Sequence, residues 1–371
     1  MKNKKDVKNN NKSTKQKKIK ILNDKKRTRI LFCITVLLTI LLISSTYAWF
    51  KASLNVKVKF INMKVSTDSG LFISLDGVNF SSEIEVSKES IMEDINDIYP
   101  NHTNQWASSG LWTVSSNGIE NSNSDKFNLF YGELGKYRSG EKKGQRYLST
   151  MKMDESKKQS WNRYIAFDIF LKNVSGSPKS DNLYLTEETY FQFEDGYLDS
   201  LEEDDRVEME GIMNSIRLGI VRIGDTTLKA DKDTIQNLKC NNNCKAIIYE
   251  PFSTSHTEKS IEDAAEYGIT MSDGEYIPTY GVYNEGIYLN HKSCYFNSGV
   301  SIDTEHFALQ KTIQDSDLDD PIFQLANGIT KLRVYIWLEG QDIDSLETHS
   351  TGAPIDVGLD FIKDLSGYEG Y

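Results

Sequence analysis

Apolar and polar residues alternate along short runs that recur from residue 54 to residue 361. The clearest run covers 332–339, where Leu, Val, Ile and Leu occupy every second position. Further runs lie at 54–65, 165–172, 216–222 and 355–361. In the run at 216–222, Arg217 and Arg222 are expected to point outward. A period of two residues is typical of a strand with one buried face, because successive side chains point to opposite faces of a sheet. The chain is therefore predicted to be all-β, with antiparallel sheets packed as a sandwich.

Loop insertions and a few short helices are expected between these strands. The stretches 100–125, 135–144 and 252–297 are rich in Gly, Ser and Asn, which favours long loops. Asp320 followed by Pro321 predicts the start of one short helix, and 202–216 is a weaker helical candidate. The strand at 54–65 should contain a bulge near Phe60 and Ile61, and a strand at 71–75 should return from it as a hairpin.

The first 50 residues predict how the chain meets a membrane. Residues 1–29 are rich in Lys and Arg, with Asp6 and Asp24 as their acids, whereas the whole chain has a net charge of −11. Residues 30–50 carry no charge, and at ~1.5 Å per residue they could span a hydrocarbon core of ~30 Å. We therefore expect a basic cytoplasmic tail at 1–29, a signal peptide or transmembrane helix at 30–50, and an extracellular domain at 51–371.

The apolar segment could be removed or kept. Its strongly apolar part, residues 30–43, has the length of a signal-peptide core, and small residues follow it up to Ala48. Cleavage between Ala48 and Trp49 and retention as a membrane anchor both stay open. In either case the N-terminus is cytoplasmic and the C-terminal part lies outside, at the cell membrane or the extracellular surface. The acidic remainder would repel nucleic acid, so no nucleic-acid partner is expected.

The four cysteines suggest one local disulfide. Cys33 lies in the apolar segment, where it acts as a small hydrophobic residue. Cys240 and Cys244 bracket a polar Asn-Asn-Asn turn, so a disulfide between them is predicted. Cys294 would then be unpaired, although either other pairing is possible. No histidine lies at a metal-binding spacing from Cys240 and Cys244, so neither a metal nor a cofactor is expected.

Residue patterns typical of catalysis do not occur, and the five histidines are scattered in polar contexts. The chain is therefore not expected to be an enzyme. The acidic run from Asp315 to Asp320 lacks the Gly and the bidentate Glu of a calcium loop, which favours a solvated helix start. The tryptophans outside the apolar segment are either a binding surface or ordinary core aromatics; they are Trp106, Trp112, Trp161 and Trp337.

Two segments resemble known exported proteins. Ser45–Phe50, at the end of the apolar run, is similar to the signal region of the TasA/camelysin group of Gram-positive surface proteins. That resemblance implies a SipW-type signal peptidase as a partner, with Ala48 before the cut. It also implies a jelly-roll-like β-sandwich that forms matrix fibres by donating an N-terminal strand. Tyr335–Asp342 resembles a recurring motif of exported proteins with similar signals, which often have a cysteine at the position of Ser345 here.

The functional expectation follows from export, β structure and this resemblance. The chain is expected to be an exported or membrane-anchored cell-surface structural protein, a candidate subunit of a biofilm matrix or fibre. Its first strand, 54–65, could pair with another copy or with its own sheet. The alternative function is a cell-surface binding module or adhesin for glycan or protein. An extracellular hydrolase is the third and weakest expectation.

Overall fold

A computed structural model of the chain describes residues 58–67, 70–92, 99, 102–107, 110–117, 125–153, 163–175, 179–241, 244–266, 272, 274–288, 304–345 and 353–364. These residues belong to one compact unit, residues 55–371. The predicted tail at 1–29 and the apolar segment at 30–50, with Ala48 and Trp49, lie outside the described residues.

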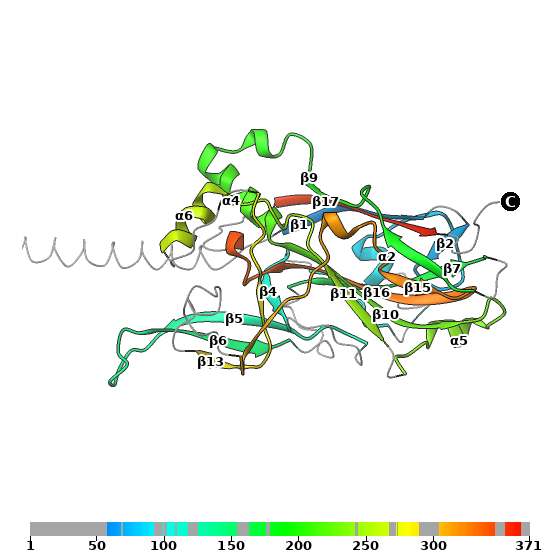
Figure 1. Ribbon diagram of the computed structural model, residues 1–371, viewed down its shortest axis with the longest axis horizontal. Coiled ribbons are helices and arrows are strands. Elements are labelled where there is room, and N and C mark those ends of the chain that lie inside the picture. Colours follow the sequence, from blue (N-terminus) through cyan, green and yellow to red (C-terminus); the bar gives the residue numbers. More distant parts are fainter. Residues whose placement is uncertain are drawn as a thin grey trace, which may run out of the picture. The chain divides into compact units, whose positions relative to one another are not determined.

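The first sheet joins the two ends of the described chain. Its strands are β1 (Val58–Thr67), β3 (Glu83–Glu85), β8 (Asp181–Leu185), β9 (Tyr190–Phe193), β15 (Phe323–Leu325) and β17 (Ala353–Asp364). They are hydrogen-bonded in the order β15-β8-β17-β1-β3, and β9 pairs with a separate part of β17. β1 and β17 lie side by side in one layer (Figure 1). The sheet is therefore assembled from segments that are far apart in sequence.

The second sheet is centred on β16. Its central strands are β2 (Leu71–Ser74), β7 (Ile165–Asn173), β16 (Gly328–Glu339), β10 (Ile216–Thr226) and β11 (Lys245–Tyr249), in that order. Beyond the end of its pairing with β7, β16 pairs with β4, which continues the sheet. The added strands are β4 (Thr113–Ser116), β5 (Leu129–Lys136), β6 (Arg146–Lys152) and β13 (Gly286–Tyr288). β12 (Tyr280–Val282) and β14 (Phe307–Leu309) form a separate pair.

Among the described residues, helices are short and few, as predicted. They are α2 (Lys88–Met92), α4 (Glu203–Asn214), α5 (Lys232–Gln236) and α6 (Glu258–Glu266), with 3-10 turns η1 (Leu198–Ser200), η2 (Asp315–Asp317) and η3 (Ile343–Ser345). The candidate at 202–216 corresponds to α4. The helix predicted after Pro321 was wrong, because that segment forms β15 and pairs with β8. Phe323 and Leu325 are buried there, and this burial outweighs the local start signal.

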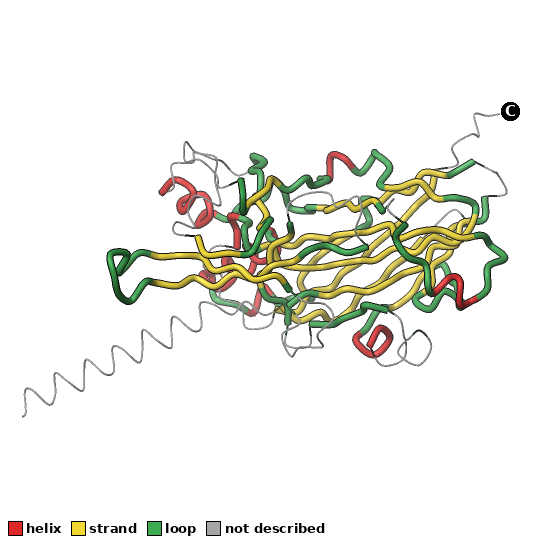
Figure 2. The backbone as a smooth tube through the Cα atoms, turned by 90° about the horizontal axis from the view of Figure 1, so that it is seen from below, coloured by secondary structure: helices red, strands yellow, loops and turns green. Residues whose placement is uncertain are grey.

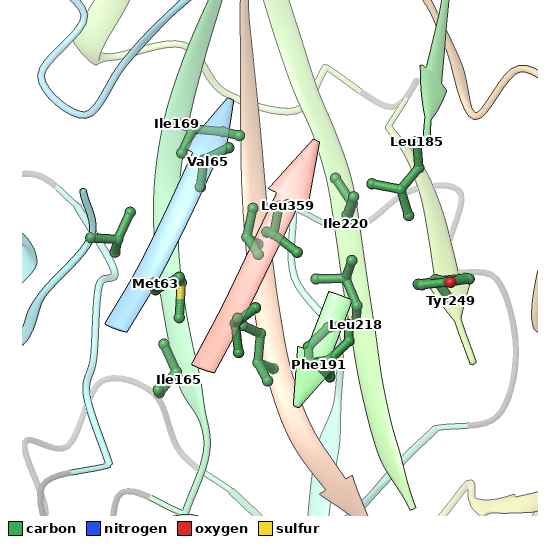
Figure 3. Close-up of a cluster of buried hydrophobic side chains, with 14 of the residues drawn as sticks. Met63, Val65, Ile165, Ile169, Leu185, Phe191, Leu218, Ile220, Tyr249 and Leu359 are labelled. Carbon is green, nitrogen blue, oxygen red and sulfur yellow. The ribbon is translucent and has the colours of Figure 1, made fainter. Parts of the chain in front are cut away.

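One hydrophobic core lies between the two sheets. Met63 and Val65 of β1 and Leu359 of β17 face Ile165 and Ile169 of β7 and Leu218 and Ile220 of β10 (Figure 3). The long strands of both sheets run along a common direction (Figure 2). The fold is therefore mostly β, with two sheets packed on a shared core, as the alternating runs predict.

Two predictions about strand pairing were wrong. Most pairs are antiparallel, but β1 with β17 and β16 with β4 are parallel. β1 and β2 do not form the predicted hairpin, since β1 pairs with β17 and β3, whereas β2 pairs with β7 in the other sheet. The turn around Gly70, which has a φ of 78°, thus carries the chain from one sheet to the other. The predicted bulge is confirmed by a register shift between Phe60 and Met63.

The outer face of the second sheet is also buried. Every residue of β16 is buried, and Tyr335 and Trp337 form a second core with Phe127 and Val114. The segments predicted as long loops also contain regular structure, since β4 lies in 100–125, and α6, β12 and β13 lie in 252–297. Val114 of β4 contributes to the second core. Arg217 was expected to point outward from its strand, yet it is fully buried. Alternation thus identified two faces, but both are covered.

Candidate functional site

A buried polar cluster forms where β16 ends, within the motif singled out at 335–342. Glu339, the last residue of β16, is fully buried. Its carboxylate accepts four hydrogen bonds, from Trp337 Nε1 at 3.1 Å, Gln310 Nε2 at 2.6 Å and the backbone N–H groups of Ser116 at 3.3 Å and Gln341 at 3.1 Å. A buried carboxylate is stable only when its oxygens are satisfied in this way. Glu339 therefore ties the end of β16 to β4 and to the segment before η2.

Arg217 of β10 is the cation of this cluster. Its guanidinium pairs with the carboxylates of Glu250 and Asp342, and all three side chains are buried. It also donates to the backbone oxygen of Ile216 at 3.0 Å, and Thr312 donates to Glu250 at 2.7 Å. Arg217 therefore joins β10 to the residue after β11 and to the turn after β16 through charge-assisted hydrogen bonds.

The carboxyl of Asp342 has a pKa raised to near neutral pH. Burial raises the pKa of its carboxyl, Arg217 lowers it, and the acids Asp344 and Glu250 raise it again, to about 7. Its Oδ1 accepts a hydrogen bond from the backbone N–H of Asp344 at 2.8 Å. A carboxyl in this state can hold or release a proton under physiological conditions.

Asp344 connects the cluster to the start of α6. It accepts from the backbone N–H of Thr257 at 2.9 Å and pairs with His256 Nδ1 at 2.8 Å. His256 Nε2 lies 2.8 Å from the backbone oxygen of Glu275. Because both ring nitrogens face acceptors, both must donate, which requires the charged imidazolium. Burial lowers the pKa of His256, but the contacts with Asp344 outweigh it and the pKa is raised.

A second buried cluster lies between β7 and β16. Asp168 of β7 pairs with Arg333 at 2.8 Å and with Lys331 at 3.1 Å, and Lys331 also contacts Tyr99. Burial would raise the pKa of Asp168, but Arg333 and Lys331 outweigh it and hold the pKa below its usual value. This arrangement keeps the acid ionised between two cations on the neighbouring strand.

Both clusters suit a structural role better than a chemical one. The side chains of Arg217 and Asp168 are fully buried, and their partners come from the strands and turns they connect. Ion-pair networks inside a fold perturb pKa values as active sites do, so the perturbed groups alone do not indicate catalysis. Among the described residues, no group of three or more His, Cys, Asp or Glu side chains could hold a metal ion.

The predicted disulfide residues are joined in the structure. Cys240 and Cys244 form a disulfide with a Cα to Cα distance of 5.6 Å, between α5 and β11. Cys244 is buried in the second core. Cys33 and Cys294 lie outside the described residues.

The tryptophans do not share one role. Trp337 is fully buried in the second core, and Trp106 packs against the main core. Trp112 lies under the guanidinium of Arg163, 4.9 Å from the ring centre. Trp161 lies outside the described residues. Two of the four candidates are thus core aromatics.

Sequence reasoning singled out the motif but missed its partners. Arg217, Glu250 and His256 were not considered as site residues, although they complete the cluster around Asp342 and Asp344. One usable signal was Arg217 itself, because the remaining residues of the run 216–221 are apolar or Gly. Such a residue is expected to be paired when both faces of the strand are buried.

An apolar groove lies beside β9 and α4. It has a cavity volume of about 410 Å³, and its apolar lining comes from Phe191, Phe193, Leu198, Met213 and Phe252. Acidic residues complete the lining, namely Glu194, Asp195, Asp199 and Glu210. The groove can accept an apolar group that carries or adjoins positive charge.

No family model, curated protein or solved structure matches this chain. In the part of the chain that the structure describes, no helix combines the length and apolarity needed to cross a membrane. The class of protein defined here is a mostly β protein with two packed sheets, several buried ion clusters and a local disulfide.

Proposed function

We propose that this chain is an exported or membrane-anchored cell-surface structural protein that self-associates as a matrix or fibre subunit. Its fold, in this proposal, is a jelly-roll-like β-sandwich with insertions. The observation that carries the proposal is the position of β1, the first described strand, which lies inside its sheet between β17 and β3. It occupies a place that a strand from another copy could fill.

The β1 slot is flanked by β17, which is distant from β1 in sequence, and by β3, which follows β1 closely. Its parallel pairing runs from Val58 opposite Ala353 to Thr67 opposite Phe361. Met63 and Val65 enter the shared core, so the slot needs a strand with β1's alternating pattern. Backbone pairing supplies affinity and the buried side chains supply register in strand addition of this kind.

The route to strand exchange is short. β1 lies near the start of the compact unit and follows the predicted apolar segment in sequence, and a short turn around Gly70 links it to β2. If that turn opens, β1 can leave its own sheet and form the same pairing with β17 and β3 of a neighbour. Exchange of an identical element costs little once the protein is concentrated, and heterologous exchange repeats into a filament.

The export part of the proposal rests on residues 1–50. The basic tail and the uncharged segment at 30–50 favour a cytoplasmic N-terminus and an outside C-terminal domain. A SipW-type signal peptidase would cut after Ala48, leaving Trp49 first, and an oxidising exterior would suit the Cys240–Cys244 disulfide. N-terminal sequencing of protein from separated medium and membrane fractions tests this. Full-length protein confined to membranes would instead favour the anchored form.

Catalysis is not part of the proposed role. The acids of the motif, Glu339 and Asp342, are engaged with Trp337 and Arg217 in the interior. Their contacts hold strand ends together and do not gather at the apolar groove beside β9.

Strand exchange is tested with a cysteine pair across β1 and β17. Ser66 and Asp360 are register partners, and the Ser66 hydroxyl donates to Asp360 at 2.5 Å. In a background with Cys33→Ser and Cys294→Ser, the pair Ser66→Cys with Asp360→Cys is oxidised at high protein concentration. Exchange predicts a ladder of covalent multimers on a denaturing, non-reducing gel.

The control pair is Tyr131→Cys with Met151→Cys, on neighbouring strands of the β5–β6 hairpin. This hairpin is local, so its disulfide should stay within one chain at every concentration. Multimers from the Ser66–Asp360 pair alone support exchange. Monomers from both pairs would show that β1 stays in its own sheet and would contradict the proposal.

The apolar groove beside β9 favours a second candidate, a surface binding module or adhesin. Phe193 and Phe252 offer apolar contact there, and Glu210 adds negative charge. Saturable binding of a glycan or protein by the monomer, lost in Phe252→Ala, would support this alternative. Binding by filaments alone would instead support the self-association proposal.

A further inference from the structure

A lysine, an asparagine and an aspartate from three strands meet inside the fold. Lys363 lies near the end of β17, Asn173 at the end of β7, and Asp181 at the start of β8. All three are buried, with exposed fractions of 5% for Lys363, 0% for Asn173 and 3% for Asp181. Lys363 belongs to one sheet and Asn173 to the other, so the contact crosses the core between them.

The amine of Lys363 lies closer to the Asn173 amide than to the Asp181 carboxylate. Lys363 Nζ donates to Asn173 Oδ1 at 2.8 Å, whereas Asp181 Oδ2 is 3.5 Å away. Lys331, the other buried lysine among the described residues, shows the ordinary arrangement, with Asp168 at 3.1 Å. A charged amine that is removed from water normally takes a carboxylate as its nearest partner. The position of Lys363 therefore needs another explanation.

The orientation of the Asn173 amide is fixed by its neighbours. Its Nδ2 donates to Asp181 Oδ2 at 3.0 Å and to the backbone oxygens of Ala326 at 3.2 Å and Leu325 at 3.5 Å. Three acceptors surround the nitrogen, and Lys363 donates to the oxygen. The amide carbon thus has the amine on one side and an acid in contact with its nitrogen.

We propose that Lys363 and Asn173 form an intramolecular isopeptide bond, with Asp181 transferring the protons. Asp181 is suited to this because its Oδ2 contacts both nitrogens, the one that attacks and the one that leaves. The reaction needs a nucleophile, an acid–base group and exclusion of water, and these three buried residues supply all of them.

The step balances without any added reactant. Asp181 takes one proton from the Lys363 ammonium, and the neutral amine attacks Cγ of Asn173. The new N–Cγ bond forms, the Cγ–Nδ2 bond breaks, and Asp181 passes its proton to the leaving nitrogen. The attacking nitrogen loses a second proton, so the products are a secondary amide, one ammonium ion and the regenerated Asp181 carboxylate. No atom is oxidised or reduced.

The bond would join the two sheets covalently. Lys363 and Asn173 are 190 residues apart, so the link would close a long loop and restrict the unfolded chain as a disulfide does. It would also secure β17, the strand that pairs with β1, to the end of β7 in the opposite sheet. This inference does not rest on strand exchange, because all three residues lie outside β1.

The test is a reduced, denatured tryptic digest of the full chain, analysed by mass spectrometry. The expected result is one branched peptide that joins the segments around Asn173 and Lys363, lighter than their sum by one ammonia. The unlinked peptide that contains Asn173 should disappear. If both segments appear only as separate, unmodified peptides, the proposal is overturned.

Asp181→Asn tests the role of the acid while leaving both joined residues in place. It should yield the separate peptides, and Lys363→Arg should do the same, whereas Lys331→Met should keep the branched peptide. A branched peptide in folded Asp181→Asn would remove Asp181 from the mechanism. If that variant does not fold, the wild-type digest still decides whether the bond exists.

Discussion

Val65 of β1 lies directly opposite Leu359 of β17 in a parallel pair, so the first and last described strands are neighbours. Both side chains are buried in the shared core, with 0% and 1% exposed. The two ends of the described chain therefore close one sheet together. The free energy of unfolding should depend strongly on the pairing of β1 with β17, called the β1–β17 seam below.

Leu359→Ala should lower the free energy of unfolding by about 2–5 kcal/mol, because it leaves a cavity in a well-packed core. The control is Ile362→Ala on the same strand, which removes a side chain that is 38% exposed and should cost much less. Denaturant unfolding of both variants measures the difference. Equal losses would mean that the seam is not packed as described.

Arg217→Met should cost about 3–5 kcal/mol, since it leaves the buried Glu250 and Asp342 without their cation. Arg222→Met on the same strand is the matched control. Arg222 pairs with Asp225 near the surface, so its loss should cost less than about 1 kcal/mol. Chemical denaturation gives both values, and a small loss for Arg217→Met would show that the cluster does not stabilise the fold.

Gly219→Ala should destabilise the second core by about 1–3 kcal/mol. A Cβ at this position would lie 2.9 Å from a ring carbon of Trp337 and closer still to Phe127. Adding Phe127→Leu makes room for the methyl group, so the double variant should lose less than the sum of the single losses. Strict additivity would indicate that the Phe127 ring does not cause the strain.

Alternation predicted the strands well because the period of a strand is local. The runs at 165–172, 332–339 and 355–361 all lie in strands. Partners were harder to predict, because pairing is decided by packing between distant segments. β1 pairs with β17 and not with the nearby β2. Phe323 lies in a strand, although Asp320 and Pro321 favour a helix.

Only part of the candidate site could be predicted from the sequence. The segment at 335–342 was singled out by resemblance, but Arg217 lies in β10 and Glu250 lies directly after β11, and the sequence around them does not indicate which residues they pair with. Alternation also placed Arg217 on a polar face, because a single strand cannot reveal that a second layer covers it. Asn173 and Lys363 gave no signal at all.

Asp342 and His256 make stability depend on pH in the same direction. The pKa of Asp342 in the folded protein, about 7, exceeds that of a free carboxyl, so the folded state binds this proton more tightly. Stability from this group is full below about pH 4 and is lost as the pH rises to 7. The raised pKa of His256 likewise adds stability that is lost as the pH rises through it.

The free energy of unfolding should therefore fall between about pH 5 and about pH 8, on the order of 1 kcal/mol for each unit of pKa shift involved. Asp168 does not oppose this, because its lowered pKa acts only in more acidic solution. Asp342→Asn removes one titration and should flatten the dependence, whatever its effect on absolute stability. Denaturant titrations at both pH values measure the slope, and an unchanged slope in Asp342→Asn would assign the dependence to other groups.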